Sequence, residues 1–148
     1  MAITLDGGIA LVTGAVSGIG KETVFALAQA GVEGVILADL NLSGAELVAQ
    51  ESTKKWATNS YFRTTAVQAD VSDEAAVNNM VDVAVKEFGR IDYCVHAAGI
   101  GSISGATTEH LKVADPIVFL CSPAASYTNE ATLIINSGIT LTIPRTSL

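Results

Sequence analysis

The sequence predicts an α/β fold with a parallel sheet of five strands, in the order 3-2-1-4-5, and helices on both faces. Short apolar runs alternate with longer segments in which apolar residues recur every three or four positions. Glycines follow several of these runs, where a strand turns or a helix stops. This alternation is typical of right-handed strand–helix–strand units, which build parallel sheets.

The five expected strands differ in character. Residues 9–12 and 35–38 are continuous apolar runs, as expected for strands buried on both faces. The third strand, at 64–69, is more polar and is expected near a sheet edge, and the fourth spans 91–95. The fifth, at 132–136, is expected to pair with the fourth, which would otherwise present an unpaired apolar edge.

Four main helices are expected between the strands. Residues 19–30 and 43–56 have amphipathic spacing, and Gly31 stops the first of these helices. The last helix, at 109–120, contains Pro116, which predicts a kink or a late start.

The third helix has signals at both ends. Ser72 is expected to be its N-cap, with the acidic residues Asp73 and Glu74 in its first turn. The helix should run to about residue 88 and end at Gly89.

Length and composition indicate a single domain covering residues 1–148. The chain is 49% hydrophobic and carries a net charge of −7, which disfavours binding to nucleic acid phosphates or anionic membranes. It has no signal-peptide pattern and no apolar run near the ~18 residues of a membrane span. Cys94 and Cys121 lie within apolar runs and are expected to be buried free thiols, which favours a reducing, cytoplasmic location.

The glycines between the first strand and the first helix predict a phosphate site. Gly14, Gly18 and Gly20 lie at the expected N-terminus of a helix, which has unpaired N–H groups and a partial positive charge. Asp39, nineteen residues after Gly20 at the end of the second strand, could accept hydrogen bonds from ribose hydroxyls. The alternatives are a tight turn without ligand for the glycines and a capping acid for Asp39.

Asp39 also bears on the choice of nucleotide. A carboxylate there repels a 2′-phosphate, and neither residue 40 nor residue 41 is an arginine that could accept one. The sequence therefore favours NAD over NADP as cofactor.

These motifs resemble the short-chain dehydrogenase/reductase family, which implies a Rossmann-like fold. Thr13-Gly-x-x-x-Gly18-x-Gly20 has that family's glycine spacing, and the segments at 96–99 and 113–122 resemble its fourth strand end and its last helix. By this resemblance the cofactor-binding residues are expected to be Gly14, Ser17, Gly18, Ile19, Gly20, Asp39, Asp70, Val71, Ala98 and Gly99. Asp70 and Val71 correspond to the family's adenine-contacting pair.

The family's catalytic residues have no counterpart in this sequence. The resemblance implies hydride transfer by a Tyr-x-x-x-Lys pair, an upstream serine and a helical asparagine. None of the three tyrosines, Tyr61, Tyr93 and Tyr127, has a lysine four residues later. The sequence therefore resembles a truncated member without the central catalytic segment, joined near residues 107–109.

His96 is the main candidate for replacement chemistry, ahead of Ser102, Ser104 and Glu109, which are better explained as ordinary loop polarity. It stands at the end of the fourth strand, where open α/β sheets bind ligands, and imidazole titrates near neutral pH. The alternative is a partly buried structural histidine. No cysteine–histidine spacing indicates a metal site.

Three functions remain open at this point. The first is binding of NAD or an adenine nucleotide without hydride transfer by the family mechanism. The second is an enzyme on the shortened cleft that uses His96, either of a non-redox class, such as an isomerase or cyclase, or a residual oxidoreductase. The third is a degenerate or splice-derived protein with a structural or regulatory role. A homodimer is expected in each case, because the shortened sheet leaves an open edge.

Overall fold

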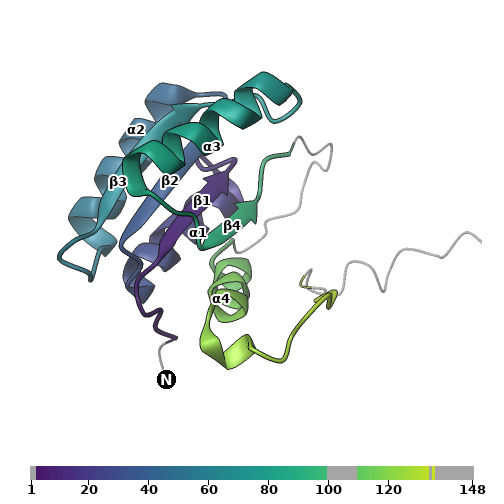
Figure 1. Ribbon diagram of the computed structural model, residues 1–148. Helices are drawn as coiled ribbons and strands as arrows, with labels where there is room; N and C mark the ends of the chain where they lie inside the picture. Colours follow the sequence, from purple (N-terminus) through teal and green to yellow (C-terminus); the bar gives the residue numbers. More distant parts are fainter. Residues whose placement is uncertain (1–2, 100–109, 134, 136–148) are drawn as a thin grey trace, which may run out of the picture.

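A parallel four-stranded sheet forms the centre of the molecule, with strand order β3-β2-β1-β4 (Figure 1). The structure is a computed structural model and describes residues 3–99, 110–133 and 135. In chain order its elements are β1 (Ile9–Thr13), α1 (Gly18–Ala30), β2 (Gly34–Asp39), α2 (Leu42–Glu51), a π-helical turn (Ser52–Trp56), β3 (Arg63–Gln68), α3 (Glu74–Phe88), β4 (Tyr93–His96), α4 (His110–Cys121) and a 3-10 turn (Pro123–Ala125).

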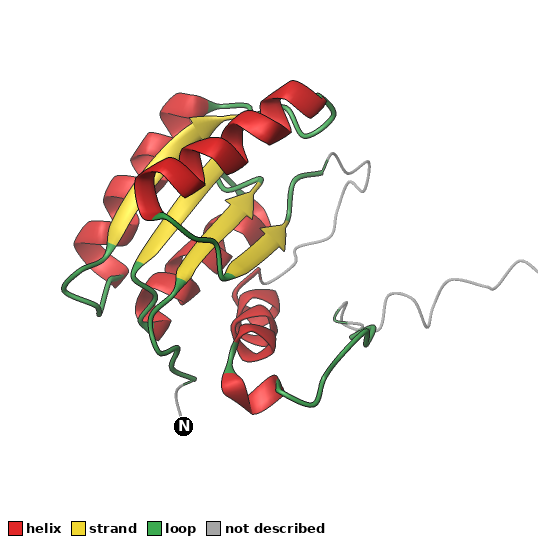
Figure 2. Cartoon of the chain, in the orientation of Figure 1, coloured by secondary structure: helices red, strands yellow, loops and turns green. Residues whose placement is uncertain are grey.

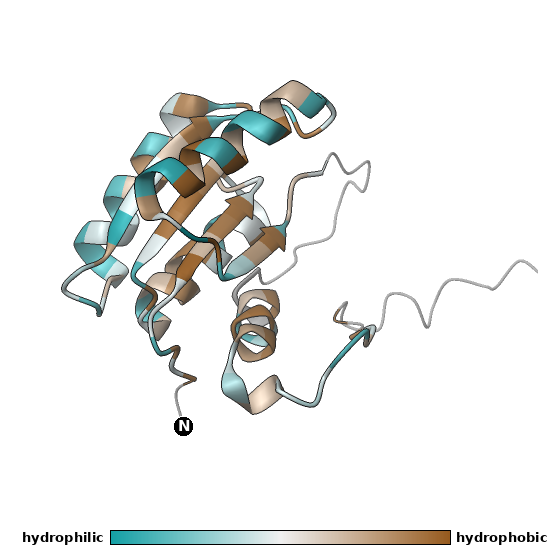
Figure 3. Cartoon of the chain, in the orientation of Figure 1, coloured by the Kyte–Doolittle hydropathy of each residue, from teal (hydrophilic) through white to brown (hydrophobic). Residues whose placement is uncertain are grey.

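Helices cover both faces of the sheet, as the strand–helix alternation predicted (Figure 2). On one face, side chains such as Val12, Leu37 and Leu27 form a core with residues of α1, α2 and α4. On the other, Leu11 and Ile36 pack against residues of α3. The strands β1 and β2 are accordingly strongly hydrophobic, as is much of α4, whereas hydrophilic and hydrophobic residues alternate along α3 (Figure 3). The predicted α/β class is confirmed.

Helices α1 and α3 each end at a glycine in the left-handed conformation. Gly31 and Gly89 adopt φ values of 105° and 78° directly after α1 and α3, and their N–H groups bond to Leu27 and Val85 in the preceding turns. Left-handed backbone is strained for residues with a side chain, so glycine is the residue that ends these helices. Both predicted helix stops are confirmed.

The cap of α3 is not the predicted one. Asp73 occupies the N-cap position, and its Oδ1 accepts a hydrogen bond of 3.1 Å from the backbone N–H of Ala75. Ser72 donates its hydroxyl to Asp70 instead. Several capping residues stand side by side in this sequence, and the carboxylate nearer to the helix takes the position.

The predicted fifth strand is absent from the residues that the structure describes. Thr132, Leu133 and Ile135 have no strand structure, and the rest of that prediction, residues 134 and 136, lies outside the described residues. Helix α4 packs against α1, burying Ala114 and Val118, and the chain then turns away through the 3-10 turn (Figure 1). This path does not carry the chain to β4, so the order is 3-2-1-4 in the described residues.

Cys94 is exposed, whereas the sequence predicted burial. Its register partner Leu11 belongs to the core under α3, but the described part of that core contains no residue of β4. The side chain therefore lies on an uncovered edge strand. Cys121 is partly buried, and both cysteines are free thiols, as predicted.

Candidate functional site

The loop between β1 and α1 is packed too closely for side chains at two of its glycines. Gly14 has φ +67°, and a Cβ there would lie 2.7 Å from the backbone N of Ala98. A Cβ at Gly20 would lie 2.7 Å from the carbonyl carbon of Gly14. The structure thus brings three predicted residues, Gly14, Gly20 and Ala98, into one contact at the carboxyl edge of the sheet.

The N-terminus of α1 is open to an anion. Ser17 is the N-cap, yet its side chain makes no capping hydrogen bond, and the first turn, which includes Gly18 and Ile19, has no acidic residue. The first N–H groups of a helix lack partners within it, and the helix dipole makes this end positive. In the described chain this end therefore has the free donors and the charge that a phosphate requires.

Asp39 is held in a fixed orientation at the end of β2. Its Oδ2 accepts a hydrogen bond of 3.1 Å from Val16 N–H, and its Oδ1 accepts one of 3.0 Å from Asn41 N–H. The carboxylate therefore joins the glycine loop to the start of α2. An ionised carboxylate has about four acceptor positions, so both oxygens retain acceptor capacity for hydroxyl donors.

Asp70 and Val71 follow β3 at the same edge of the sheet. The carboxylate of Asp70 accepts hydrogen bonds from the hydroxyl (2.6 Å) and the N–H (2.9 Å) of Ser72, which lower its pKa. Val71 is about half exposed, and Ala69 N–H donates to the Asp39 carbonyl at 3.0 Å. The predicted residues at the ends of β2 and β3 are thus neighbours.

The end of β4 is tied to β1. The Ala98 N–H donates to the Thr13 hydroxyl at 3.3 Å, and the Ala97 N–H donates to the Thr13 carbonyl at 3.3 Å. A Cβ at Gly99 would meet no atom of the described chain within 4 Å.

His96 is exposed on the edge strand. Its Nε2 lies 3.5 Å from the Cys94 thiol, and no hydrogen bond joins the ring to a carboxylate in the described part of the chain. Desolvation by neighbouring atoms raises the pKa of the Cys94 thiol, although its side chain is exposed, and so favours the protonated form.

Two of the tyrosines, Tyr61 and Tyr93, lie at the amino edge of the sheet, away from the glycine loop. Tyr61 precedes β3 and is 81% exposed, and Tyr127 follows α4 and is fully exposed. Tyr93 begins β4, and its hydroxyl donates to the Gly7 carbonyl at 3.4 Å. Burial raises the pKa of Tyr93, which disfavours its phenolate at neutral pH.

Three site contacts escaped the sequence interpretation, namely those of Thr13, Val16 and Asn41. Asn41 carried a readable signal, because an asparagine just before a helix is a strong N-cap, and its side chain does accept from Gly44 N–H at 3.0 Å. The Thr13 hydroxyl and the Val16 N–H act through loop geometry, which leaves no pattern in the sequence.

No group of three or more potential metal ligands occurs among the described residues. Within the same residues, no helix has the length and apolarity needed to cross a membrane.

Comparison with known proteins identifies the family. The family described as short chain dehydrogenase matches residues 8–127 of the chain. The chain therefore belongs to the short-chain dehydrogenase family, as the glycine spacing indicated.

Curated relatives are longer than this chain. It is 50% identical to short-chain dehydrogenase anuF of Penicillium roqueforti over 101 residues, which cover 68% of this chain and 36% of that protein. It is 34% identical to an uncharacterised oxidoreductase of Methylorubrum extorquens over 146 residues, which cover 93% and 57% of the two chains. The chain thus spans between about a third and somewhat over half of these relatives.

Solved structures agree on the fold. Hydroxysteroid dehydrogenase from Escherichia coli superposes with a TM-score of 0.61 at 27% identity, covering 77% of this chain and 53% of the other. L-sorbose reductase from Gluconobacter frateurii, solved with NADPH and L-sorbose, gives 0.62 at 25% identity, with coverage of 82% and 48%.

Proposed function

We propose that this chain is a dinucleotide-binding domain, residues 1–148, that binds NAD(H) or an adenine nucleotide. The proposal rests chiefly on the N-terminus of α1, where uncapped N–H groups follow a glycine loop without room for side chains. The position of Asp39 beside this loop, fixed by Val16 and Asn41, adds a ribose acceptor.

Each predicted residue has a part in this proposal. The loop residues Gly14, Ser17, Gly18, Ile19 and Gly20 would hold the pyrophosphate, and Asp39 the adenosine ribose. Asp70 and Val71 would contact the adenine, and Ala98 and Gly99 would bound the site at the end of β4. The close contact between Gly14 and Ala98 supports placing both segments around one ligand.

We infer a preference for NAD over NADP. The Asp39 carboxylate would repel a 2′-phosphate, and the two residues after it, Leu40 and Asn41, carry no positive charge to offset that repulsion. The structural neighbour L-sorbose reductase binds the phosphorylated cofactor, as its NADPH complex shows, so titration of this chain with both NAD and NADP tests the preference.

We also infer that the chain does not transfer hydride by the family mechanism. A bound nicotinamide would supply the hydride acceptor or donor, but the chain would have to supply the proton at the substrate oxygen. Two tyrosines lie at the amino edge, Tyr127 is fully exposed, and none has a lysine four residues later. Alcohols and ketones should give no turnover above background.

Calorimetry with NAD and ADP tests the proposal. Without the lysine that grips the nicotinamide ribose, charge-assisted hydrogen bonds of ~1.5–3 kcal/mol each are missing, so ADP should bind almost as well as NAD. NAD binding more than about a hundredfold tighter would show that the nicotinamide half is held. Absence of binding by both would refute the nucleotide site itself.

A second candidate is an enzyme of another reaction class that uses His96. It is favoured by the likeness to (+)-cis,cis-nepetalactol synthase NEPS3 of Nepeta racemosa, 31% identical over 74% of this chain and 38% of that protein. His96 is exposed, however, and the described chain does not enclose it. A cyclase or isomerase activity lost in His96→Ala, with nucleotide binding kept, would support this candidate.

Two further properties belong to the proposal. We expect the protein in the cytoplasm, because both cysteines are free thiols and a reducing compartment keeps them so. We also expect a homodimer through the open edge strand β4 or the neighbouring helices.

A further inference from the structure

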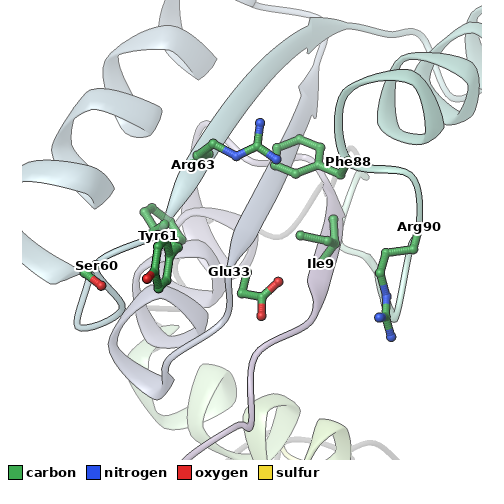
Figure 4. A pocket seen from close by; sticks show the side chains of 8 residues that line it. Ile9, Glu33, Ser60, Tyr61, Arg63, Phe88 and Arg90 are labelled. Atoms are coloured by element: carbon green, nitrogen blue, oxygen red, sulfur yellow. The ribbon is translucent and has the colours of Figure 1, made fainter.

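A cleft of about 570 Å³ lies at the amino edge of the sheet, and Figure 4 shows the side chains that line it. The glycine loop follows the other end of β1. The lining of the cleft includes Ile9, Glu33, Tyr61, Arg63, Phe88 and Arg90. These residues come from the starts of β1 and β3, the loops before β2 and β3, the end of α3 and the loop that follows it. The proposed nucleotide function uses none of them.

The apolar floor of the cleft is built around Phe88. A Cβ at Gly34 would lie 2.5 Å from Cε1 of Phe88, so the ring rests directly on that glycine. In the sheet register Gly34 stands between Ile9 and Arg63, and Ile9 is 3% exposed. The missing side chain at position 34 thus makes room for an aromatic surface between an apolar and a cationic neighbour.

Arg63 is positioned over this floor. Its guanidinium carbon lies 4.7 Å from the centre of the Phe88 ring, and Nη2 donates to the Glu87 carbonyl at 3.5 Å. Guanidinium groups that stack on an aromatic ring keep the edge of their fork free for a carboxylate.

The other arginine is already satisfied. Arg90 pairs with Asp92, which raises the pKa of Arg90, and the second oxygen of Asp92 accepts from Ile9 N–H at 2.8 Å. Among the described residues no ion pair involves Arg63 or Glu33, and no hydrogen bond reaches the Glu33 carboxylate, although its charge also contributes to the raised pKa of Arg90. The cleft therefore presents one charge of each sign that has no ion-pair partner in the described chain.

We propose that this cleft binds a small zwitterion, namely an α-amino acid with an aromatic or large aliphatic side chain. The ligand's carboxylate meets the Arg63 fork, its ammonium meets Glu33, and its side chain covers Phe88 and Ile9. An anion would meet repulsion from Glu33 and a cation repulsion from Arg63, whereas a zwitterion satisfies both. The volume lies within the usual ~300–1,000 Å³ range of small-molecule sites.

Amide NMR titration of the full chain tests this site. L-phenylalanine should shift the signals of Gly34, Arg63 and Phe88, and leave those of Gly14–Gly20 unchanged. 3-Phenylpropionate lacks the ammonium and phenethylamine lacks the carboxylate, so each should bind at least about tenfold more weakly. Equal binding of either analogue, or no shift at the amino edge with L-phenylalanine, would overturn the proposal.

Two variants assign the charges. Glu33→Gln keeps the shape of the side chain and removes its charge. It should weaken the binding of L-phenylalanine about tenfold and should not weaken the binding of 3-phenylpropionate. Arg63→Lys keeps the positive charge but loses the planar fork of donors, so it should weaken the binding of both L-phenylalanine and 3-phenylpropionate. Glu46→Gln, an exposed change of the same charge on α2, is the control. Unchanged L-phenylalanine binding in Glu33→Gln refutes the zwitterion. ADP binding should stay the same in all three variants, so this test and that of the nucleotide site fail independently.

Discussion

Asp39 performs two roles that mutation can separate. Its carboxylate accepts N–H groups from the glycine loop and from the start of α2, so it supports the local structure. The same negative charge faces the region proposed for the ribose, where it would exclude a 2′-phosphate. A purely structural acid would affect stability alone, whereas a ribose ligand would also set the nucleotide preference.

We therefore expect Asp39→Ala to narrow the difference in affinity between NAD and NADP. In this variant NAD loses the acceptor for its ribose hydroxyls, and NADP loses a negative charge that repels its 2′-phosphate. Together these effects should change the ratio of the two dissociation constants by about tenfold or more. Calorimetry with both nucleotides measures it, and circular dichroism checks the fold. Asp82→Ala, which removes the same charge from an exposed position on α3, should change neither affinity. A wild-type preference for NADP contradicts the placement of Asp39 beside the ribose.

Among the glycines of the described residues, Gly20 has the least room for a side chain. A Cβ there meets the backbone of Gly14, which belongs to the loop itself and has no flexible end to move aside. We expect Gly20→Ala to abolish ADP binding and lower the melting temperature. The comparison is Gly89→Ala at the end of α3, where a Cβ has open space and only the φ of 78° is strained. That variant should lose about 1 kcal/mol of stability and keep ADP binding. Normal ADP binding by Gly20→Ala would count against the close contact.

At the scale of elements, two aspartates near the start of α3 have different roles. Asp73 caps the helix, whereas Asp70 accepts hydrogen bonds within the turn before it. Asp73 caps the helix through Ala75 N–H, so Asp73→Ala should lower the free energy of unfolding by about 1 kcal/mol. Ser72 instead donates to Asp70, so Ser72→Ala should leave α3 stable and raise the pKa of Asp70 toward its usual value. Urea unfolding measures the first effect and carboxyl NMR titration the second.

The sign of the Asp70 effect follows from linkage. Because the folded protein lowers the pKa of Asp70, this group contributes stability above its unfolded pKa near 3.8, and the contribution is lost as pH falls through the folded value. Ser72→Ala should therefore flatten the acid limb of the stability curve. Equal unfolding free energies of Asp73→Ala and the wild type at neutral pH would instead identify Ser72 as the cap, as the sequence pattern had suggested.

The elements recovered from sequence are those with local signals. The strands β1 and β2 are continuous apolar runs, and α1 and α3 end in glycine, so spacing and end residues suffice. The π-helical turn at Ser52–Trp56 was predicted as ordinary helix, because its apolar spacing does not differ. The fifth strand failed because strand pairing depends on where α4 directs the chain, and that is a tertiary property.

At the scale of the molecule, the candidate site likewise combines residues that local sequence signals identify with contacts that only the tertiary structure creates. The glycines and Asp39 were found from spacing, whereas the contact of Gly14 with Ala98 joins residues far apart in the sequence. The exposure of Cys94 likewise depends on which part of the sheet α3 covers. What the sequence could not supply is therefore the relative placement of segments, and β4 is where this matters most.

We expect the outer edge of β4 to mediate dimerisation. In the described residues β4 pairs only with β1, so its outer side offers unpaired backbone groups, with Cys94 and His96 exposed on one face. Such an edge recruits another strand unless it is covered or charged. We expect sedimentation velocity to give a dimer of twice the 15.2 kDa chain mass, and Cys94→Lys to convert it to monomer. Val85→Lys, at a half-exposed position on α3, is the matched change on a helix. Dissociation by Val85→Lys alone would place the interface on the helices, and a wild-type monomer at micromolar concentration would refute dimerisation.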